Sequence, residues 1–308
     1  MGEFSKYVGE VGEEIVSDFL KLFGWKNMCS NKQLDCFVGE HGKRTHGIDA
    51  LYVYNSILQK QSLVSVVVSA KYSSVPYDSV KSTFREHFKD LAQTIECYSK
   101  SQLKRTITKQ FSGSSRKEDI GVLFYLNNDE DESNDNIKSK IINSRIDSSL
   151  KYTAIHVIDN ARAKFLYSSL NFIKKRHGEI SFFCLNTTLN VASPTRHSKI
   201  MPVEYITSPI IPISVPDENG RKFILLCDFN YSQESLALVY KLARKLCSDF
   251  ASHYEIYFNR YNKLTDSPSV DEVKMAQSFD VDFDDAVSES TLIVDTYNST
   301  FRSISDEK

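Results

Sequence analysis

The sequence GIDALYVYNSILQKQSLVSVVVSAK, residues 47–71, predicts two neighbouring β-strands. Its two apolar runs, Ile48–Tyr54 and Leu63–Tyr72, are rich in Val, Tyr and Ile, which favour extended backbone. A Ser-containing stretch of polar residues separates the runs, as expected of a loop. The two runs are therefore expected to lie side by side in one sheet.

Polar and charged side chains near the ends of these strands form a candidate site. Asp49 lies near the start of the first run, where a carboxylate is unfavourable unless a partner or a cation balances its charge. Ser69 and Lys71 are two residues apart on the second run, so they project from the same face. Each residue taken alone has an ordinary explanation as a loop or strand-end residue. A site is indicated because Asp49, Ser69 and Lys71 all lie near the ends of these neighbouring strands.

An amphipathic helix is predicted at Tyr7–Phe23, because apolar residues recur there on one face at about 100° per residue. Glu13 borders this apolar face and is expected to face the sheet edge. Glu10 and Glu14 are expected to point away from it. With the charged residues of the two strands, Glu13 completes a set suited to metal-dependent phosphodiester cleavage.

The remaining pattern of the first segment is typical of an α/β unit built on a mixed sheet. The further elements that it predicts are a strand at Leu34–Val38, a long helix at Ser79–Phe111 and a buried strand at Ile120–Leu126.

After residue 127 the sequence predicts two further regions. The acidic run Asn127–Asn136 is too polar to be buried and marks a boundary. We therefore expect domains at 1–127 and 128–264 and an acidic tail at 265–308. The second domain is expected to bind substrate or a partner, and its predicted elements are strands at Tyr152–Ile158, Ile180–Leu185, Val203–Ile206 and Phe223–Phe229 and helices at Asp159–Gly178 and Ser232–Tyr261.

The tail alternates aspartates with Phe279, Val281 and Phe283. We expect these three apolar side chains to dock against the basic body of the protein or against a partner.

Composition places the chain among soluble globular proteins. It has 308 residues, of which 41% are hydrophobic, 25% charged and 12% aromatic, which excludes collagen-like, disordered and membrane-spanning classes. Its apolar runs are far shorter than a bilayer requires, and the first residues lack an apolar signal segment. We therefore expect a cytoplasmic protein with no membrane contact.

The net charge of −2 conceals a strong segregation along the chain. Residues 1–118 carry +4 and residues 136–264 carry +8, whereas 119–135 carry −6 and 265–308 carry −8. This basic body is compatible with a polyanionic partner such as DNA, although ordinary surface lysines account for it equally well.

The six cysteines include no Cys-x-x-Cys pair and are expected to be reduced. Cys29, Cys36, His41 and His46 could offer four zinc ligands within eighteen residues. Their intervals fit no standard zinc finger, so the sequence favours isolated residues over a zinc site.

Three short motifs together resemble the PD-(D/E)XK nuclease superfamily. The resemblance extends over residues 6–127, and its motifs are Gly12-Glu13 followed by Val16, Leu20, Gly24 and Trp25, then Gly47-Ile48-Asp49-Ala50, then Ser69-Ala70-Lys71. It implies a restriction-endonuclease-like mixed sheet flanked by helices, with Asp49 and Lys71 on adjacent strands and the Glu13 helix packed across their ends. It also implies a DNA nuclease, in a setting such as bacterial defence against phage or plasmids.

The same resemblance implies Mg²⁺ as cofactor, with Mn²⁺ possible. Asp49 and Glu13 would hold the metal, and Lys71 would orient the attacking water and stabilise charge on the phosphate.

The sequence departs from the family at Ser69, where the family has an acidic residue. A hydroxyl is a neutral and weaker ligand, so two functions stay open. One is a nuclease, in which Glu86 or Glu96 on the following helix could replace the missing carboxylate. The other is a catalytically degenerate nuclease-fold subunit that binds DNA or a partner protein within a homo- or hetero-oligomer.

Overall fold

The computed structural model describes residues 2–26, 29–59, 61–128, 137–184, 197–218, 220–247, 253–278 and 291–298. The chain divides into two compact units, each with its own sheet. The first unit comprises Met1–Lys164 and Met201–Thr207, and the second comprises Phe165–Ile200 and Ser208–Lys308. None of the helices in the described residues is long and apolar enough to cross a membrane.

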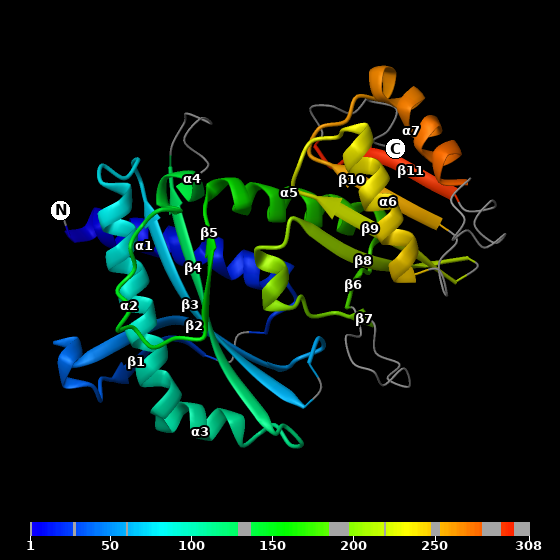
Figure 1. Cartoon of the computed structure of the whole chain (residues 1–308). Coiled ribbons are helices and arrows are strands. Elements are labelled where there is room, and N and C mark those ends of the chain that lie inside the picture. Colours follow the sequence, from blue (N-terminus) through cyan, green and yellow to red (C-terminus); the bar gives the residue numbers. More distant parts are fainter. Residues whose placement is uncertain are drawn as a thin grey trace. The chain divides into compact units, whose positions relative to one another are not determined.

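The first unit is built on a five-stranded mixed sheet of order β1-β2-β3-β4-β5 (Figure 1). β1 pairs antiparallel with β2 and β2 antiparallel with β3, whereas β4 is parallel to both β3 and β5. The strands are β1 (Cys29–Asp35), β2 (Thr45–Asn55), β3 (Ser62–Ser73), β4 (Arg116–Asn127) and β5 (Ala154–Ile158). This is the mixed α/β sheet that the sequence predicts.

Helices cover both faces of this sheet (Figure 1). α1 (Gly2–Leu22) packs on β3, where Gly12 meets Tyr72. α2 (Val80–Lys100) packs on the opposite face, in a core that includes Leu63 and Val67 of β3. Since neighbouring strand residues alternate between faces, even- and odd-numbered residues of β3 meet different helices. The described residues of this unit also form η1 (Gly39–His41), α3 (Gln102–Thr108), α4 (Ile137–Ile141) and η3 (Val203–Ile206).

The sequence predicts one helix over Ser79–Phe111. This prediction is wrong, because the helix is interrupted at Ser101. Ser101 has extended backbone, with φ −76° and ψ 157°, and its side chain accepts a hydrogen bond from Lys104 N. This residue ends α2 and begins α3 as its N-cap. The apolar spacing continues across the break, which is why periodicity alone does not reveal it.

The strand predicted at Val203–Ile206 is also wrong, since this segment is the 3₁₀-helix η3. The segment belongs to the first unit although it is remote in sequence. Trp25 Nε1 donates to Met201 O at 2.8 Å, and Val203 N donates to the Tyr54 hydroxyl at 3.0 Å. These hydrogen bonds replace the ladder that a strand would need.

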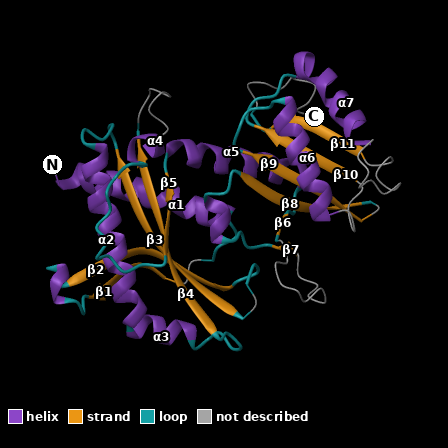
Figure 2. Ribbon diagram, viewed as in Figure 1, coloured by secondary structure: helices purple, strands orange, loops and turns teal. Residues whose placement is uncertain are grey.

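The second unit contains a six-stranded sheet of order β11-β10-β9-β8-β6-β7 (Figure 2). Its strands are β6 (Ser181–Phe183), β7 (His197–Ser198), β8 (Ile210–Asp217), β9 (Gly220–Cys227), β10 (His253–Phe258) and β11 (Thr291–Thr296). Its helices are α6 (Gln233–Cys247), α7 (Lys263–Ser278) and most of α5 (Asn160–His177).

Two predictions for this unit need correction. The helix predicted at Ser232–Tyr261 ends at Cys247, and its last part is β10, a parallel strand between β9 and β11. The predicted acidic tail contributes α7 and β11, so part of it is integral to the fold. Phe279, Val281 and Phe283, the predicted docking residues, lie outside the described residues.

The unit boundaries differ from the expected domains 1–127, 128–264 and 265–308. β5 extends the first sheet beyond residue 127, because it pairs with β4 from Ile120↔Ala154 to Phe124↔Ile158. The polar run Asn127–Asn136, the signal used to place the boundary, thus lies between two strands of one sheet rather than between two domains.

Candidate active site

The central pair of strands brings the predicted site residues together. β2 and β3 are adjacent and antiparallel, and Ala50 of β2 pairs with Val68 of β3. Asp49 immediately precedes Ala50, and Ser69 immediately follows Val68, so both lie at the same end of the strand pair. Lys71 is two residues further along β3, as the sequence predicts.

The Asp49 carboxylate is held by the backbone of the neighbouring strand. Its Oδ2 atom accepts a hydrogen bond from Ala70 N at 2.6 Å. Burial raises the pKa of Asp49, and the negative charge of Glu13 raises it further. The Ala70 N–H, the Lys71 ammonium and the Ser69 hydroxyl all lower the pKa of Asp49. Glu13, Ser69 and Lys71 therefore all influence the charge state of the half-buried Asp49 carboxylate.

A close helix contact positions Glu13. Gly12 is buried on α1, and a Cβ atom at this position would lie 2.7 Å from Tyr72 Cβ. Only glycine permits this approach without a shift of the helix. Glu13 is the next residue, and its Oε2 atom accepts a hydrogen bond from Asn31 Nδ2 at 3.0 Å.

A pocket of about 330 Å³ opens between α1 and the ends of β1–β3. Glu13, Asp49 and Ala70 line it, together with Glu10 and Glu14. The expectation that Glu10 and Glu14 point away from the site is therefore wrong. One wide polar stripe of α1 faces this pocket, because residues three and four apart share a helix face.

A second pocket, of about 450 Å³, lies on the Lys71 side of the same strand. Ala70 lines both pockets, and Lys71, Gly12, Tyr72 and His87 line the second. Burial lowers the pKa of His87, and the positive charge of Lys71 lowers it further. His87 is thus a neutral imidazole beside a lysine at neutral pH.

Neither carboxylate proposed to replace the missing acidic ligand lies at this site. Glu86 lines a different pocket, with Arg85, Lys89 and Arg145. Glu96 forms ion pairs with His41, Lys100 and Lys151. The carboxylates that do accompany Asp49 all come from α1.

Glu10, Glu13, Glu14 and Asp49 line one pocket, and carboxylate oxygen is the ligand atom that Mg²⁺ and Mn²⁺ prefer. Among the described residues, no three of these carboxylates converge as the ligands of one ion do, so a bound cation would have to draw them together. A cation near Asp49 would also offset the raised pKa that burial gives this carboxylate.

The sequence does not predict Asn31 or His87 as site residues. Asn31 adopts a left-handed backbone with φ 49°, a conformation in which asparagine is enriched. Asn31 lies inside β1, between the paired residues Ser30 and Lys32, and no local sequence signal marks it as a site residue. His87 lies on α2 without a local motif, and only the packing of α2 brings it beside Lys71.

A family model described as the GAPS4 protein PD-(D/E)XK nuclease domain matches residues 1–162, just over half of the chain. No curated protein and no solved structure matches the chain. The matched residues include the four predicted site residues and extend beyond residue 127 through β5 to the start of α5.

Proposed function

The chain belongs to the family of GAPS4 PD-(D/E)XK nuclease domains, and we propose that it is a metal-dependent nuclease that hydrolyses DNA phosphodiester bonds in defence against phage. The observation that carries the proposal is that Glu13 and Asp49 line one pocket while Lys71 lines the neighbouring pocket, with Ala70 shared between the two. This arrangement goes beyond the family match, because it concerns the side chains that would perform the reaction.

In this proposal the pockets on either side of Ala70 act together. A phosphate above Ala70 has carboxylates on one side and the Lys71 ammonium on the other. Lys71 stabilises the negative charge that develops on the phosphate and orients the attacking water. The Ala70 N–H fixes the Asp49 carboxylate, so this group needs little reorganisation during the reaction.

Asp49 and Glu13 are the residues that would hold Mg²⁺, or Mn²⁺ in its place, with Glu10 and Glu14 adding negative charge. When bound, such a cation supplies Lewis-acid charge stabilisation and a water of lowered pKa. Ser69 contributes a hydrogen bond to Asp49 rather than a charge.

The alternative is a degenerate nuclease-fold subunit that binds DNA or a partner protein in a homo- or hetero-oligomer. Ser69 favours this function, because a hydroxyl leaves the site with one less negative charge than an acidic residue would. The extra carboxylates of α1 offset that loss, so we place the nuclease first. The expectation that residues 128–264 bind substrate or a partner stays a proposal. The second unit as the structure divides the chain, residues 165–200 and 208–308, has a net charge of −3, so charge gives no support to DNA binding there.

Cleavage of plasmid and linear DNA, with an RNA of matched length, tests the proposal in Mg²⁺ and in Mn²⁺. Lys71→Ala should lower the cleavage rate about 100-fold or more, because it removes the cation that stabilises the phosphate charge. Lys21→Ala is the matched control, since Lys21 is exposed and its amine pairs with Asp18.

Cleavage by the wild type that Lys71→Ala loses and Lys21→Ala keeps supports a nuclease. If the wild type cuts neither nucleic acid with either metal, alone or with a co-purifying partner, the enzyme is excluded and the binding subunit remains. Preferential cleavage of RNA would overturn the assignment of DNA as substrate.

A further inference from the structure

Four potential metal ligands converge in the first unit, away from the pockets of the candidate active site. They are Cys36, His41, His46 and Cys97, and we call them the Cys2His2 cluster. One ligand atom from each residue lies within 4.8 Å of all the others. Three of these residues belong to the group of potential ligands noted in the sequence. Cys97 takes the place of Cys29.

Four of the six distances within the Cys2His2 cluster match those of a tetrahedral zinc site, and the two between His46 and the sulfurs are at most 4.8 Å. The two sulfur atoms are 3.8 Å apart, and the His41 Nδ1 and His46 Nε2 atoms are 3.4 Å apart. His41 Nδ1 lies 3.4 Å from Cys36 Sγ and 3.6 Å from Cys97 Sγ. With Zn–S of about 2.3 Å and Zn–N of about 2.0–2.1 Å, a regular tetrahedron gives about 3.8 Å between sulfurs, about 3.3 Å between nitrogens and about 3.6 Å between the two kinds.

Local structure directs these four atoms inward. Cys36 follows β1, His41 ends η1, and His46 lies on β2. Gly42 adopts a left-handed backbone with φ 65° and closes η1, which lets the chain turn back toward β2. Cys97 reaches the same point from α2 and is fully buried.

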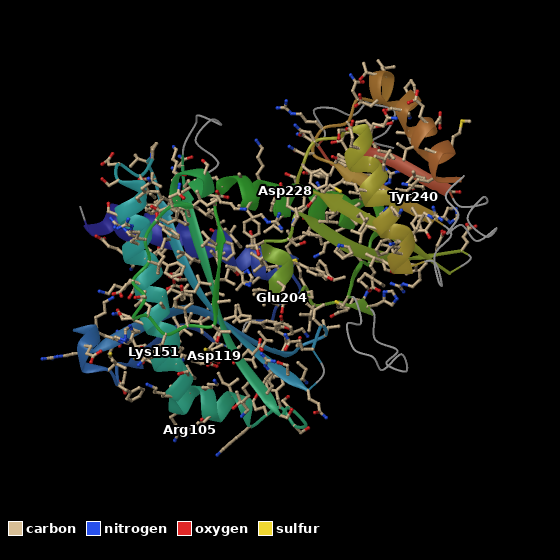
Figure 3. The ribbon with its side chains drawn as sticks, viewed as in Figure 1. Arg105, Asp119, Lys151, Glu204, Asp228 and Tyr240 are labelled. Carbon is tan, nitrogen blue, oxygen red and sulfur yellow. The ribbon has the colours of Figure 1, made fainter. Side chains whose placement is uncertain are left out.

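The surroundings of the Cys2His2 cluster also fit a metal site. His41 directs its Nε2 atom to the Glu96 carboxylate at 3.4 Å, while its Nδ1 atom faces the cluster. Histidine ligands of metals almost always pair their second ring nitrogen in this way. Glu96 is in turn held by Lys100 and Lys151, each at 3.4 Å (Lys151 is labelled in Figure 3).

The surroundings of Cys97 and His46 differ from those of His41. Cys97 is fully buried, so its sulfur is shielded from water. His46 is 2% exposed, and its Nδ1 atom has no hydrogen-bond partner among the described residues. The polar contact of its ring is therefore the one that Nε2 makes inside the cluster.

We propose that the Cys2His2 cluster is a structural zinc site. Four protein ligands leave no open coordination position, which distinguishes a structural from a catalytic zinc. Cys36 and Cys97 are 61 residues apart, so the ion crosslinks the β1–β2 hairpin to α2. His46 also lies three residues before Asp49 on β2. Zinc thereby fixes the strand that carries the candidate active-site carboxylate.

Two other states of the same residues are physically reasonable. In a metal-free cluster the Cys36 thiol donates to Val38 O at 3.3 Å. A Cys36–Cys97 disulfide would need the sulfurs to approach from 3.8 Å to about 2.05 Å. Neither state requires His41 Nδ1 to face both sulfurs with His46 Nε2 beside it, and this convergence favours zinc.

The test is the zinc content of the full chain, purified under reducing conditions without chelator and measured by elemental mass spectrometry. The wild type should carry about one zinc per chain, and Cys36→Ser and Cys97→Ser should each lower this content about fivefold or more. Cys29→Ser is the matched control and should keep the wild-type content, because the Cys29 sulfur lies outside the cluster. Asp49→Asn should also keep it, which separates this site from the candidate active site.

Cobalt titration of the wild type removes any dependence on whether the cysteine variants fold. The intense ligand-field bands of tetrahedral Co²⁺, with thiolate charge-transfer absorption, should appear in the wild type and in Cys29→Ser. The proposal is overturned if the reduced wild type contains less than about 0.1 zinc per chain and gives no tetrahedral cobalt spectrum. A wild-type chain with Cys36 and Cys97 joined in a disulfide, or zinc that Cys29→Ser also removes, overturns it as well.

Discussion

The position of Asp49 makes its ionised carboxylate unfavourable in the folded protein. Burial and the Glu13 charge raise its pKa above the value it has in the unfolded chain. The folded state therefore holds this proton more tightly, and stability declines as pH rises through the folded pKa. At neutral pH the ionised carboxylate opposes folding unless a cation binds.

Asp49→Asn should therefore stabilise the metal-free protein at pH 7, by about 1 kcal/mol, while abolishing cleavage. Its stability should also change less than that of the wild type between about pH 4 and pH 7, since the titrating group is gone. Urea unfolding across this range measures both effects. The exposed Asp18→Asn serves as control, and an Asp49→Asn protein that is less stable at every pH would contradict the electrostatic explanation.

Ser69→Glu probes the departure from the family. Ser69 is only 8% exposed and hydrogen-bonds to Asp49, so a glutamate would bring a second negative charge next to the first. We expect a lower melting temperature without metal, a higher affinity for Mg²⁺ or Mn²⁺, and faster cleavage only if the other site residues are already competent. Calorimetric metal titration beside a cleavage time course measures these changes. Unchanged metal affinity would show that Ser69 does not face the cation.

Single residues were predictable from sequence where a strand or helix pattern isolates them. Asp49 and Lys71 stand out because they border apolar runs, and Glu13 because it borders an apolar helix face. Cys97 and His87 lie inside ordinary helical periodicity, and only the docking of α2 gives them partners. The zinc ligand set was misjudged for this reason, since Cys29 is near in sequence and Cys97 is near in space.

The contact of α1 with β3 depends on the absence of a side chain at Gly12. Gly12→Ala should destabilise the protein by about 1–3 kcal/mol, because the new methyl group meets Tyr72 Cβ close to the backbone. Moving α1 away from β3 would also displace Glu13 and lower cleavage. Gly9→Ala is the matched control on the same helix, where a Cβ has nothing within 4 Å. It should gain up to about 1 kcal/mol from helix propensity.

Chemical denaturation of the two variants tests this contact. Equal stability of Gly12→Ala and Gly9→Ala would show that α1 accommodates the methyl group by a small shift.

Long apolar strands were more predictable than the ends and interruptions of helices. Runs such as Leu63–Tyr72 are long and bounded by polar residues, so their strands lie within a few residues of the predicted positions. At 253–258, Tyr254, Ile256 and Phe258 alternate, yet with the residues before them they also match a helical spacing. β10 lies between two parallel strands, and it is buried on both faces from Tyr254 to Phe258, as is typical of an inner strand of a parallel sheet.

Residues 201–207 pack against residues that are far from them in sequence. This segment leaves the second unit to complete the first, where Met201, Val203 and Ile206 are fully buried. Arg162 also donates to the Tyr205 and Ile206 carbonyl groups. No pattern in a seven-residue stretch predicts partners as remote as Trp25, 176 residues away. A domain boundary drawn on composition therefore could not include it.

The first unit should consequently be incomplete when the chain is cut at residue 164. We compare residues 1–164 alone with a protein in which a flexible Gly/Ser linker joins 1–164 to 201–207. The linked protein should be more stable by about 3 kcal/mol or more. It regains three buried apolar side chains, and it restores carbonyl partners for the Trp25 and Arg162 donors. Thermal and urea unfolding measure the difference.

The control carries Met201→Ser, Val203→Ser and Ile206→Ser in the linked segment, which keeps the chain length while removing the apolar side chains. This control should fall back to the stability of residues 1–164, because a tethered segment that cannot bury apolar surface has no reason to dock. If all three proteins unfold at the same temperature, then the 201–207 segment contributes nothing to the first unit. The family match to residues 1–162 would then delimit a complete folding unit.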